Sequence, residues 1–244
     1  MTPPLFLVDV LPPADIAVLS GPEGRHAARV RRIGAGERVD LGDGRGSILR
    51  CEVTAVGAEE LRLTVLARTT VLRPDPELVV VQALAKGERA ELAVELLTEL
   101  GVDEIVPWAA DRSIVRWQGE RGVRALERWR LTAREAAKQS RRPWVPQITD
   151  QVTSAAAVAA LVAASAAAYV LHEAADEPLT AEALPATGRI LLVVGPEGGV
   201  TDAEVATLTA AGAVPVRLGS EVLRTSTAGA AAVAALATRL GRWS

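Results

Sequence analysis

Three loops combine residue types that can hold a small ligand. The first is a glycine-rich loop that follows the apolar run 189–194 and precedes a capping box formed by Thr201 and Glu204. Its residues are Gly195, Pro196, Glu197, Gly198 and Gly199. Glycines allow positive φ and let backbone N–H groups approach a ligand closely. The loop has neither the Lys-Ser/Thr of a Walker A sequence nor GxGxxG, which argues against nucleotide phosphates. The alternative is a tight strand-to-helix turn, because the same tetrapeptide GPEG at 21–24 looks like helix capping.

The other two loops also follow apolar runs. After the run 214–218, Leu223, Arg224 and Thr225 combine an apolar contact, a cation and a hydroxyl. His172 ends the run 168–172. Ligands of open parallel sheets collect at the carboxyl ends of strands, so these loops are the candidate site. Read one at a time, Arg224 is a surface cation and His172 a strand-end residue. That reading weakens when three such loops follow strands of one sheet.

Two kinds of segment must position these loops. Residues 1–72 show short strands with turns between them, at 5–8, 37–41, 47–56 and 60–69, which predicts a compact β barrel or sheet. Leu49, Cys51 and Val53 alternate with polar residues, as in a half-buried strand. One helix interrupts the strands after Ser20, with Glu23 as its capping-box residue.

From residue 73 strands alternate with helices, which predicts an α/β domain over 73–244 with a parallel sheet. We expect strands at 77–84, 103–108, 168–172, 189–194 and 214–218. We expect helices at 89–100, 120–140, 155–168, 202–211 and 226–240. The chain thus divides into domains 1–72 and 73–244.

Composition narrows the class of protein. The 244 residues contain one cysteine and two histidines, so a disulfide within the chain is excluded and a zinc site is not expected. Cys51 is interpreted as a buried core thiol. No apolar stretch reaches the 18 or so residues of a membrane helix. The N-terminus lacks the basic region of a signal peptide, so we expect a cytoplasmic protein with no membrane partner and no metal.

The net charge of −3 hides two basic patches. Residues 25–32 hold four arginines and no acid, and residues 112–142 hold ten Lys or Arg against three Glu. In the expected helix 120–140 the basic side chains lie opposite an apolar arc of Leu126, Trp129, Ala133, Ala136 and Ala137. One-sided positive charge favours contact with RNA. The candidate RNA-binding residues are Arg25, Arg29, Arg31, Arg32, Arg124, Arg128, Arg134, Lys138 and Arg141.

Trp117, Trp144 and His26 have two readings each. The tryptophans can stack on an unpaired base, and His26 can contact RNA. Alternatively, the tryptophans pack in the core and His26 is structural.

Four ordered segments carry a resemblance to a known family. They are KGERAELAVELLTELGVDEIVP at 86–107, ARExxKQSxR at 133–142, GPEGG at 195–199 and LGxxVLRTxTA at 218–228. In this order and spacing they resemble the RsmE family, bacterial methyltransferases of the SPOUT superfamily that act on N3 of a uridine in 16S ribosomal RNA. The likeness extends to the N-terminal β domain, which is PUA-like in that family.

The resemblance implies a SPOUT-type parallel sheet with a C-terminal trefoil knot, an exception to the rule that chains are unknotted. It also implies a PUA-like β-barrel RNA-binding domain, a homodimer, S-adenosyl-L-methionine as cofactor, and the small ribosomal subunit as partner. The implied cofactor-binding residues are Leu171, His172, Gly195, Pro196, Glu197, Gly198, Gly199, Leu218, Gly219, Val222, Leu223, Arg224, Thr225, Thr227 and Ala228. The sequence departs from many relatives in having Ser226 where they carry Glu, and Glu221 where they carry a basic residue.

Methylation of uridine N3 requires that its proton leave and that the resulting charge be stabilised. Arginine is a poor general base, but it can stabilise negative charge on the uracil oxygens. The hypothesis is that Arg224, or else Arg112 or Arg142, serves in this way and that the proton goes to water. Glu197 and His172 are alternative bases. Other functions left open are methylation of a tRNA base or ribose, and RNA binding without catalysis. Because GxGxxG is missing, a nicotinamide-dependent oxidoreductase fits least well.

Overall fold

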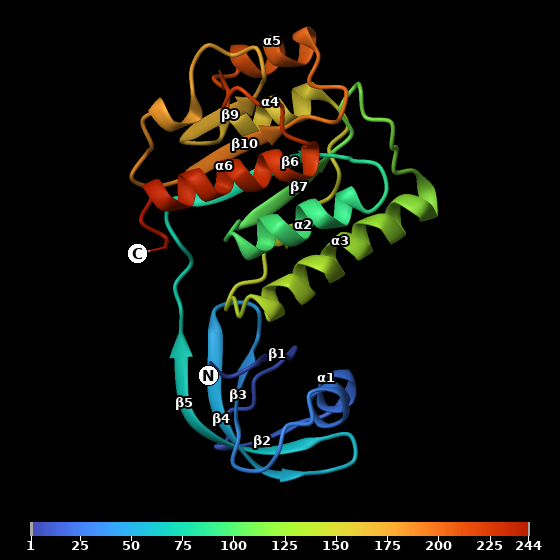
Figure 1. Ribbon diagram of the computed structural model, residues 1–244, viewed down its shortest axis with the longest axis vertical. Helices are drawn as coiled ribbons and strands as arrows, with labels where there is room; N and C mark the ends of the chain where they lie inside the picture. Colours follow the sequence, from blue (N-terminus) through green and yellow to red (C-terminus); the bar gives the residue numbers. More distant parts are fainter. Residues whose placement is uncertain (1, 244) are drawn as a thin grey trace. The chain divides into compact units, whose positions relative to one another are not determined.

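The computed structural model describes residues 2–243, and the chain forms two compact units (Figure 1). One unit contains the chain up to Arg73 together with Ala137–Val145. The other contains Pro74–Ala136 and the chain from Pro146 onward. The division therefore falls inside the long helix α3 (Gly119–Gln139).

The first unit is built on a five-stranded sheet in the order β1-β3-β4-β5-β2. Its strands are β1 (Leu5–Leu7), β2 (Ile16–Leu19), β3 (Arg38–Gly42), β4 (Ser47–Val56) and β5 (Leu61–Thr70). All neighbours are antiparallel except β1 and β3. Leu49, Cys51 and Val53 of β4 are at most 3% exposed, so the predicted alternation is confirmed and these side chains form the core.

Two local expectations in this unit were wrong. Strand β2 was not predicted, because its four residues are too few to show a period of two. The helix after Ser20 is α1 (Gly21–Arg25), continued by a π-helical turn (His26–Val30), and the Ser20 side chain makes no capping hydrogen bond. Glu23 instead accepts a hydrogen bond from Lys138 Nζ at 2.9 Å, and this ion pair replaces the expected capping box.

Residues 137–145 are bonded to the β sheet of this unit. Gly46 N–H donates to Pro143 O at 3.0 Å, and Val145 N–H donates to Gly44 O at 3.0 Å. The indole of Trp144 donates to Val71 O at 2.9 Å. The basic segment predicted to bind RNA is thus partly a structural component of the N-terminal unit.

The second unit contains a six-stranded parallel sheet in the order β11-β9-β10-β6-β7-β8. The strands are β6 (Glu77–Ala83), β7 (Glu104–Trp108), β8 (Gln147–Ile148), β9 (Ala167–Leu171), β10 (Arg189–Val194) and β11 (Val214–Val216). The helices are α2 (Arg89–Glu99), α3, α4 (Ala155–Ala163), the short 3-10 helix η2 (Leu179–Ala181), α5 (Asp202–Ala210) and α6 (Thr225–Arg239). The expected α/β class with a parallel sheet is confirmed.

Helices cover both faces of this sheet. Val79 and Val81 of β6 pack with Val158 of α4 and Leu208 of α5. Helices α2 and α6 lie on the other face (Figure 1). Because both faces are buried, the central strands are apolar at nearly every position, as in the fully buried strand Leu191–Val194.

The alanine-rich tract was assigned wrongly. It is not one helix over 155–168, because α4 ends at Ala163 and β9 begins at Ala167. Alanine side chains fit a helix or a buried strand equally well, so pairing with β10 and β11 decides the conformation here. Strand β8 was also missed. The trefoil knot stays a prediction.

Candidate active site

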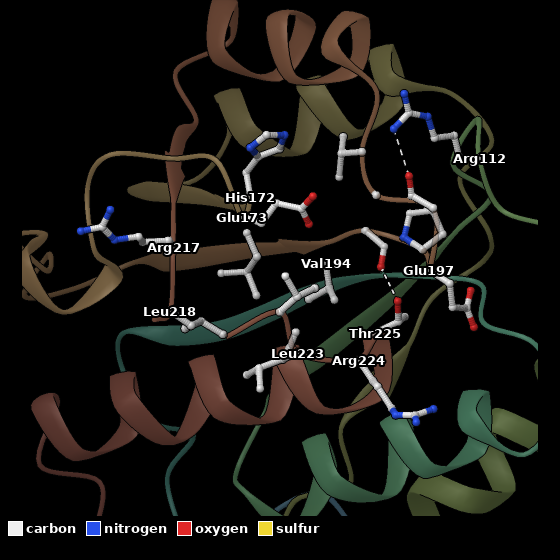
Figure 2. A pocket seen from close by; sticks show the side chains of 18 of the residues that line it. Arg112, His172, Glu173, Val194, Glu197, Arg217, Leu218, Leu223, Arg224 and Thr225 are labelled. Carbon is white, nitrogen blue, oxygen red and sulfur yellow. Dashed lines mark hydrogen bonds between the residues drawn. The ribbon is translucent and has the colours of Figure 1, made fainter. Parts of the chain in front are cut away.

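A cavity of about 620 Å³ lies at the carboxyl ends of β9, β10 and β11 (Figure 2). These strands are adjacent to one another or to β6 in the sheet, so the loops that follow them meet at one edge. The sequence places the three loops 19 or more residues apart, and the sheet brings them together.

The glycine-rich loop forms one wall. Gly199 has φ +76°, and its N–H donates to Pro196 O at 2.9 Å. A Cβ on Gly195 would lie 2.7 Å from Val200 Cγ2, so a side chain there would push the loop away. The capping box of Thr201 and Glu204 is confirmed, and it begins α5 directly after the loop.

The start of α6 forms the opposite wall. Thr225 Oγ1 donates to Gly195 O at 2.9 Å, which fixes this helix to the glycine-rich loop (Figure 2). Arg224 is the N-cap residue, but its side chain makes no capping bond and is exposed. Ser226 is 3% exposed, so the position where many relatives carry a carboxylate is buried in this chain.

The loop after β9 contributes His172. Its Nδ1 accepts a hydrogen bond from Ala174 N–H at 3.3 Å, and its ring is partly buried. When Nδ1 accepts, the proton of the neutral imidazole is on Nε2. His172 therefore offers the cavity a hydrogen-bond donor.

Arg112 reaches the glycine-rich loop from the segment after β7. Its Nη1 donates to Gly198 O at 3.0 Å (Figure 2). Arg112 and Arg224 both line the cavity, whereas Arg142 does not and belongs to the first unit. The structure thus brings two of the three candidate catalytic arginines to one cavity.

The cavity contains nearly all of the residues expected to bind a cofactor. Every one of them lines it except Thr227, which is exposed on the first turn of α6. Sequence reasoning missed eight lining residues: Arg89, Glu173, Val194, Val200, Asp202, Val216, Arg217 and Glu221. Arg89 begins α2 after β6, and a fourth loop after a buried strand was the available signal for it.

Several of the candidate RNA-binding cations already have acidic partners. Arg25 and Arg29 pair with Glu59 at 3.3 and 2.9 Å. Arg124 pairs with Glu120, and Arg128 pairs with Glu91, both at 3.3 Å. Lys138 is bound to Glu23 and its side chain is only 16% exposed, which leaves little of it for RNA. The other candidates are Arg31, Arg32 and Arg141, all exposed, and the partly buried Arg134.

The aromatic residues and the cysteine fit their structural readings. Trp117 packs edge-to-face on the buried Trp129, with ring centroids 5.0 Å apart. The guanidinium of Arg73 lies 5.0 Å from the ring centroid of Trp144. His26 packs near Phe6 at 6.3 Å. Burial raises the pKa of Cys51 to about 11, so this thiol stays protonated at neutral pH and is no nucleophile.

Two features are absent from residues 2–243. No helix in this part of the chain is both long and apolar enough to cross a membrane. No group of three or more His, Cys, Asp or Glu side chains in it could hold a metal ion.

Comparisons with known proteins agree with this architecture. A family model described as an RNA methyltransferase domain matches residues 73–237, and one described as an RNA methyltransferase PUA domain matches residues 19–66. The chain is 48% identical over 98% of its length to the Ribosomal RNA small subunit methyltransferase E of Mycobacterium bovis, 93% of which is covered. It is 29% identical to the protein of the same name from Bacillus subtilis, over 89% of this chain and 88% of that one.

A solved structure is similar over the whole chain. It is a Ribosomal RNA small subunit methyltransferase E from Neisseria gonorrhoeae bound to S-adenosyl methionine, with a TM-score of 0.85 and 26% sequence identity, and the match covers all of both chains. The family models span both units, and the identity to the mycobacterial protein extends over nearly the full length. The chain therefore belongs to the RNA methyltransferases of the ribosomal RNA small subunit methyltransferase E family, the RsmE family that its motifs resemble.

Proposed function

We propose that this protein transfers a methyl group from S-adenosyl-L-methionine to N3 of a uridine in the 16S RNA of the small ribosomal subunit. The observation that carries the proposal is a cavity lined by loops from three neighbouring parallel strands, in a chain of this family. The uridine N3 target is the one that the resemblance implies.

The cavity fits a cofactor of this size. Its volume of about 620 Å³ lies within the range of ligand sites, roughly 300–1,000 Å³. Gly195, Gly198 and Gly199 expose their backbone to it, and Val194, Leu218 and Leu223 give it an apolar lining. We propose that these residues, with His172 and Thr225, hold the cofactor.

When bound, S-adenosyl-L-methionine supplies an electrophilic methyl group. Arg224 is proposed to stabilise the negative charge that develops on the uracil oxygens as N3 loses its proton. It lines the cavity, and in the described part of the chain it forms no ion pair that would have to break first. The walls of the cavity hold the reacting groups together, and such positioning supplies a large part of the rate.

The proton is proposed to leave to water. His172 is a poor candidate for the base, because its Nδ1 already accepts from Ala174 N–H and its Nε2 carries the proton. Glu197 is exposed, and its Oε1 accepts from Lys86 N–H at 3.3 Å. Glu197→Gln should therefore keep the pH–rate profile of the wild type, and loss of an acidic limb would make Glu197 the base.

Further proposals follow from the family. The chain is expected to form a homodimer, to contain the trefoil knot, and to divide functionally into domains 1–72 and 73–244. The cytoplasm is the proposed location, because ribosomal RNA is methylated there. Sedimentation equilibrium of the purified protein tests the dimer, and a monomer at micromolar concentration contradicts it.

The test of function uses tritiated S-adenosyl-L-methionine and small ribosomal subunits from cells that lack the enzyme. Label is mapped by nuclease digestion and mass spectrometry. We expect one 3-methyluridine in 16S RNA. Cofactor binding with label in another RNA would contradict the substrate, and the absence of both binding and label would indicate an RNA-binding protein without activity.

A further inference from the structure

Two consecutive residues after β7 are bonded to the segment that contains the glycine-rich loop. Asp111 N–H donates to Glu204 Oε1 at 2.8 Å, and Arg112 Nη1 donates to Gly198 O at 3.0 Å. The two acceptors lie on either side of the start of α5. The segment after β7 is therefore attached to the loop at one point and to the helix behind it at another.

Glu204 is the buried end of this connection. It is 2% exposed, and both of its carboxylate oxygens are used. Oε2 accepts from Thr201 N–H at 2.8 Å and from Thr201 Oγ1 at 3.0 Å, while Oε1 accepts from Asp111. Hydrogen bonds to an ionised acceptor are roughly twice as strong as neutral ones. Glu204 thus fixes the segment after β7 against the first turn of α5.

Arg112 is the exposed end. Its side chain runs along Gly198: a Cβ at that glycine would lie 3.2 Å from Arg112 Cβ and 3.5 Å from its Cδ. The segment itself is held by Arg116, which donates to Ala110 O at 2.8 Å and to Asp111 O at 3.0 Å. Arg112 therefore contacts Gly198 through both its aliphatic part and its guanidinium, from a fixed support.

We propose that Arg112, supported by Glu204, is a positioning residue that holds the glycine-rich loop in the conformation that binds the cofactor. This inference rests on the proposed function. A loop with three glycines has many accessible conformations, and fixing one of them before binding removes an entropy loss from binding. Arg112 then acts on cofactor affinity and not on the charge of the uridine, which leaves that role to Arg224.

The experiment compares cofactor affinity with turnover. The dissociation constant for S-adenosyl-L-methionine is measured by calorimetry on the purified full chain without RNA, and kcat is measured with small ribosomal subunits at saturating cofactor. For Arg112→Ala we expect the Kd and the cofactor KM to rise about fivefold to tenfold, which corresponds to the net contribution of about one ordinary hydrogen bond. We expect kcat to stay within twofold of the wild type.

Two further variants give the comparison its meaning. Arg121→Ala removes an exposed arginine of α3 that does not line the cavity, and it should leave the cofactor Kd unchanged. Glu204→Gln keeps an acceptor oxygen for Asp111 N–H and should weaken cofactor binding less than Glu204→Ala does. The double variant Arg112→Ala/Glu204→Gln should raise the cofactor Kd by less than the product of the two single fold-changes, because both residues act on one loop. Thermal melting identifies any variant that fails to fold, and Arg112→Lys then replaces Arg112→Ala.

The outcomes separate this inference from the proposed function. If the wild type does not bind S-adenosyl-L-methionine, the proposed function fails. If it binds and Arg112→Ala binds equally well, or if kcat falls about 100-fold at an unchanged cofactor Kd, the positioning role is overturned while the function stands.

Discussion

At the scale of single residues, the arginines of the cavity divide by what they bind. Arg112 donates a hydrogen bond to Gly198 O, whereas Arg224 forms no ion pair or capping bond within residues 2–243. Truncating Arg224 should therefore remove its action on substrate without breaking a contact of the folded protein. This makes it the cleaner probe of the chemical step.

Arg224→Ala is expected to lower kcat on the order of 100-fold, the effect of removing one donor to a developing negative charge. The cofactor Kd should change little, because the backbone of the loop is intact. Single-turnover methylation of small ribosomal subunits measures the step directly. Arg217→Ala, which removes another exposed arginine of the same cavity, shows whether position or mere charge matters. Equal losses in both variants would contradict the assignment to Arg224.

Cys51 predicts a dependence of stability on pH. Burial, and then the charge of Asp40, raise its pKa from 9.0 to about 11. Between these values the unfolded thiol ionises while the folded thiol stays protonated. Its contribution to the free energy of unfolding is thus fully present below pH 9 and is lost as pH rises to 11, by at most about 1.4 kcal/mol per pH unit.

The measurement is urea denaturation of the wild type and of Cys51→Ala from pH 8 to 11. Comparing the two proteins cancels the contributions of other groups to the pH dependence. One such group is Tyr169, because burial also raises its pKa. The stability advantage of the wild type should shrink above pH 9. A constant difference would show that the thiol ionises equally in both states.

At the scale of elements, α6 must pack closely on the sheet for its first turn to form the wall of the cavity. Gly229 lies at this contact: a Cβ there would be 3.2 Å from Val194 Cγ2 and 3.3 Å from both Gln82 Oε1 and Leu97 Cδ2. These distances are shorter than ordinary van der Waals contacts, and the neighbours belong to β10, β6 and α2. The helix therefore requires a residue without a side chain here.

Gly229→Ala tests this packing against helix propensity. In an exposed helix the change would stabilise by about 1 kcal/mol. Here we expect it to lower the free energy of unfolding by about 1–3 kcal/mol through overpacking. Denaturant unfolding measures the change, and Thr238→Ala, at an exposed position of the same helix, controls for propensity. An increase in stability of Gly229→Ala would show that α6 can shift.

Which elements the sequence could predict depended on what fixes each one. The helices 119–139 and 202–210 were located within about one residue, because an apolar arc or a capping box is visible in the residues of the helix itself. The boundary between α4 and β9 was not, since alanine leaves the choice to strand pairing. Strand β2 has only four residues, and its pairing with β5 is not visible in its own sequence.

For the candidate site too, features determined by neighbouring residues could be predicted, and features determined by strand pairing could not. Most lining residues of the three loops could be predicted, because glycine, hydroxyl and cation patterns are local, but Glu173 and Glu221 of the same loops were missed. Arg89 was missed although its loop follows a buried strand, because the adjacency of β6 and β10 in the sheet, which places this loop at the cavity, is not visible in the sequence. The pairing of Lys138 with Glu23 was equally invisible, since the two residues are 115 positions apart.

At the scale of the whole molecule, a net charge of −3 is compatible with binding a polyanion only if some cations are not neutralised by neighbouring acids. The basic patch of residues 25–32 contains both a neutralised cation and an unpaired one. Arg25 pairs with Glu59 at 3.3 Å, whereas Arg31 is exposed and forms no ion pair within the described residues. An unpaired cation gains more from a phosphate than one that must first leave a carboxylate.

This difference predicts how affinity for small ribosomal subunits depends on salt. Filter binding from 50 to 200 mM salt gives the slope of log K against log salt. This slope is negative, and its magnitude falls by about one unit for each phosphate contact that is lost. Arg31→Gln should reduce the slope by about one unit, and Arg25→Gln should reduce it by less than half of that. Cofactor affinity should stay unchanged in both, because neither residue lines the cavity. Equal reductions would mean that Glu59 does not compete with RNA, and no reduction for Arg31→Gln would remove this patch from the RNA-binding surface.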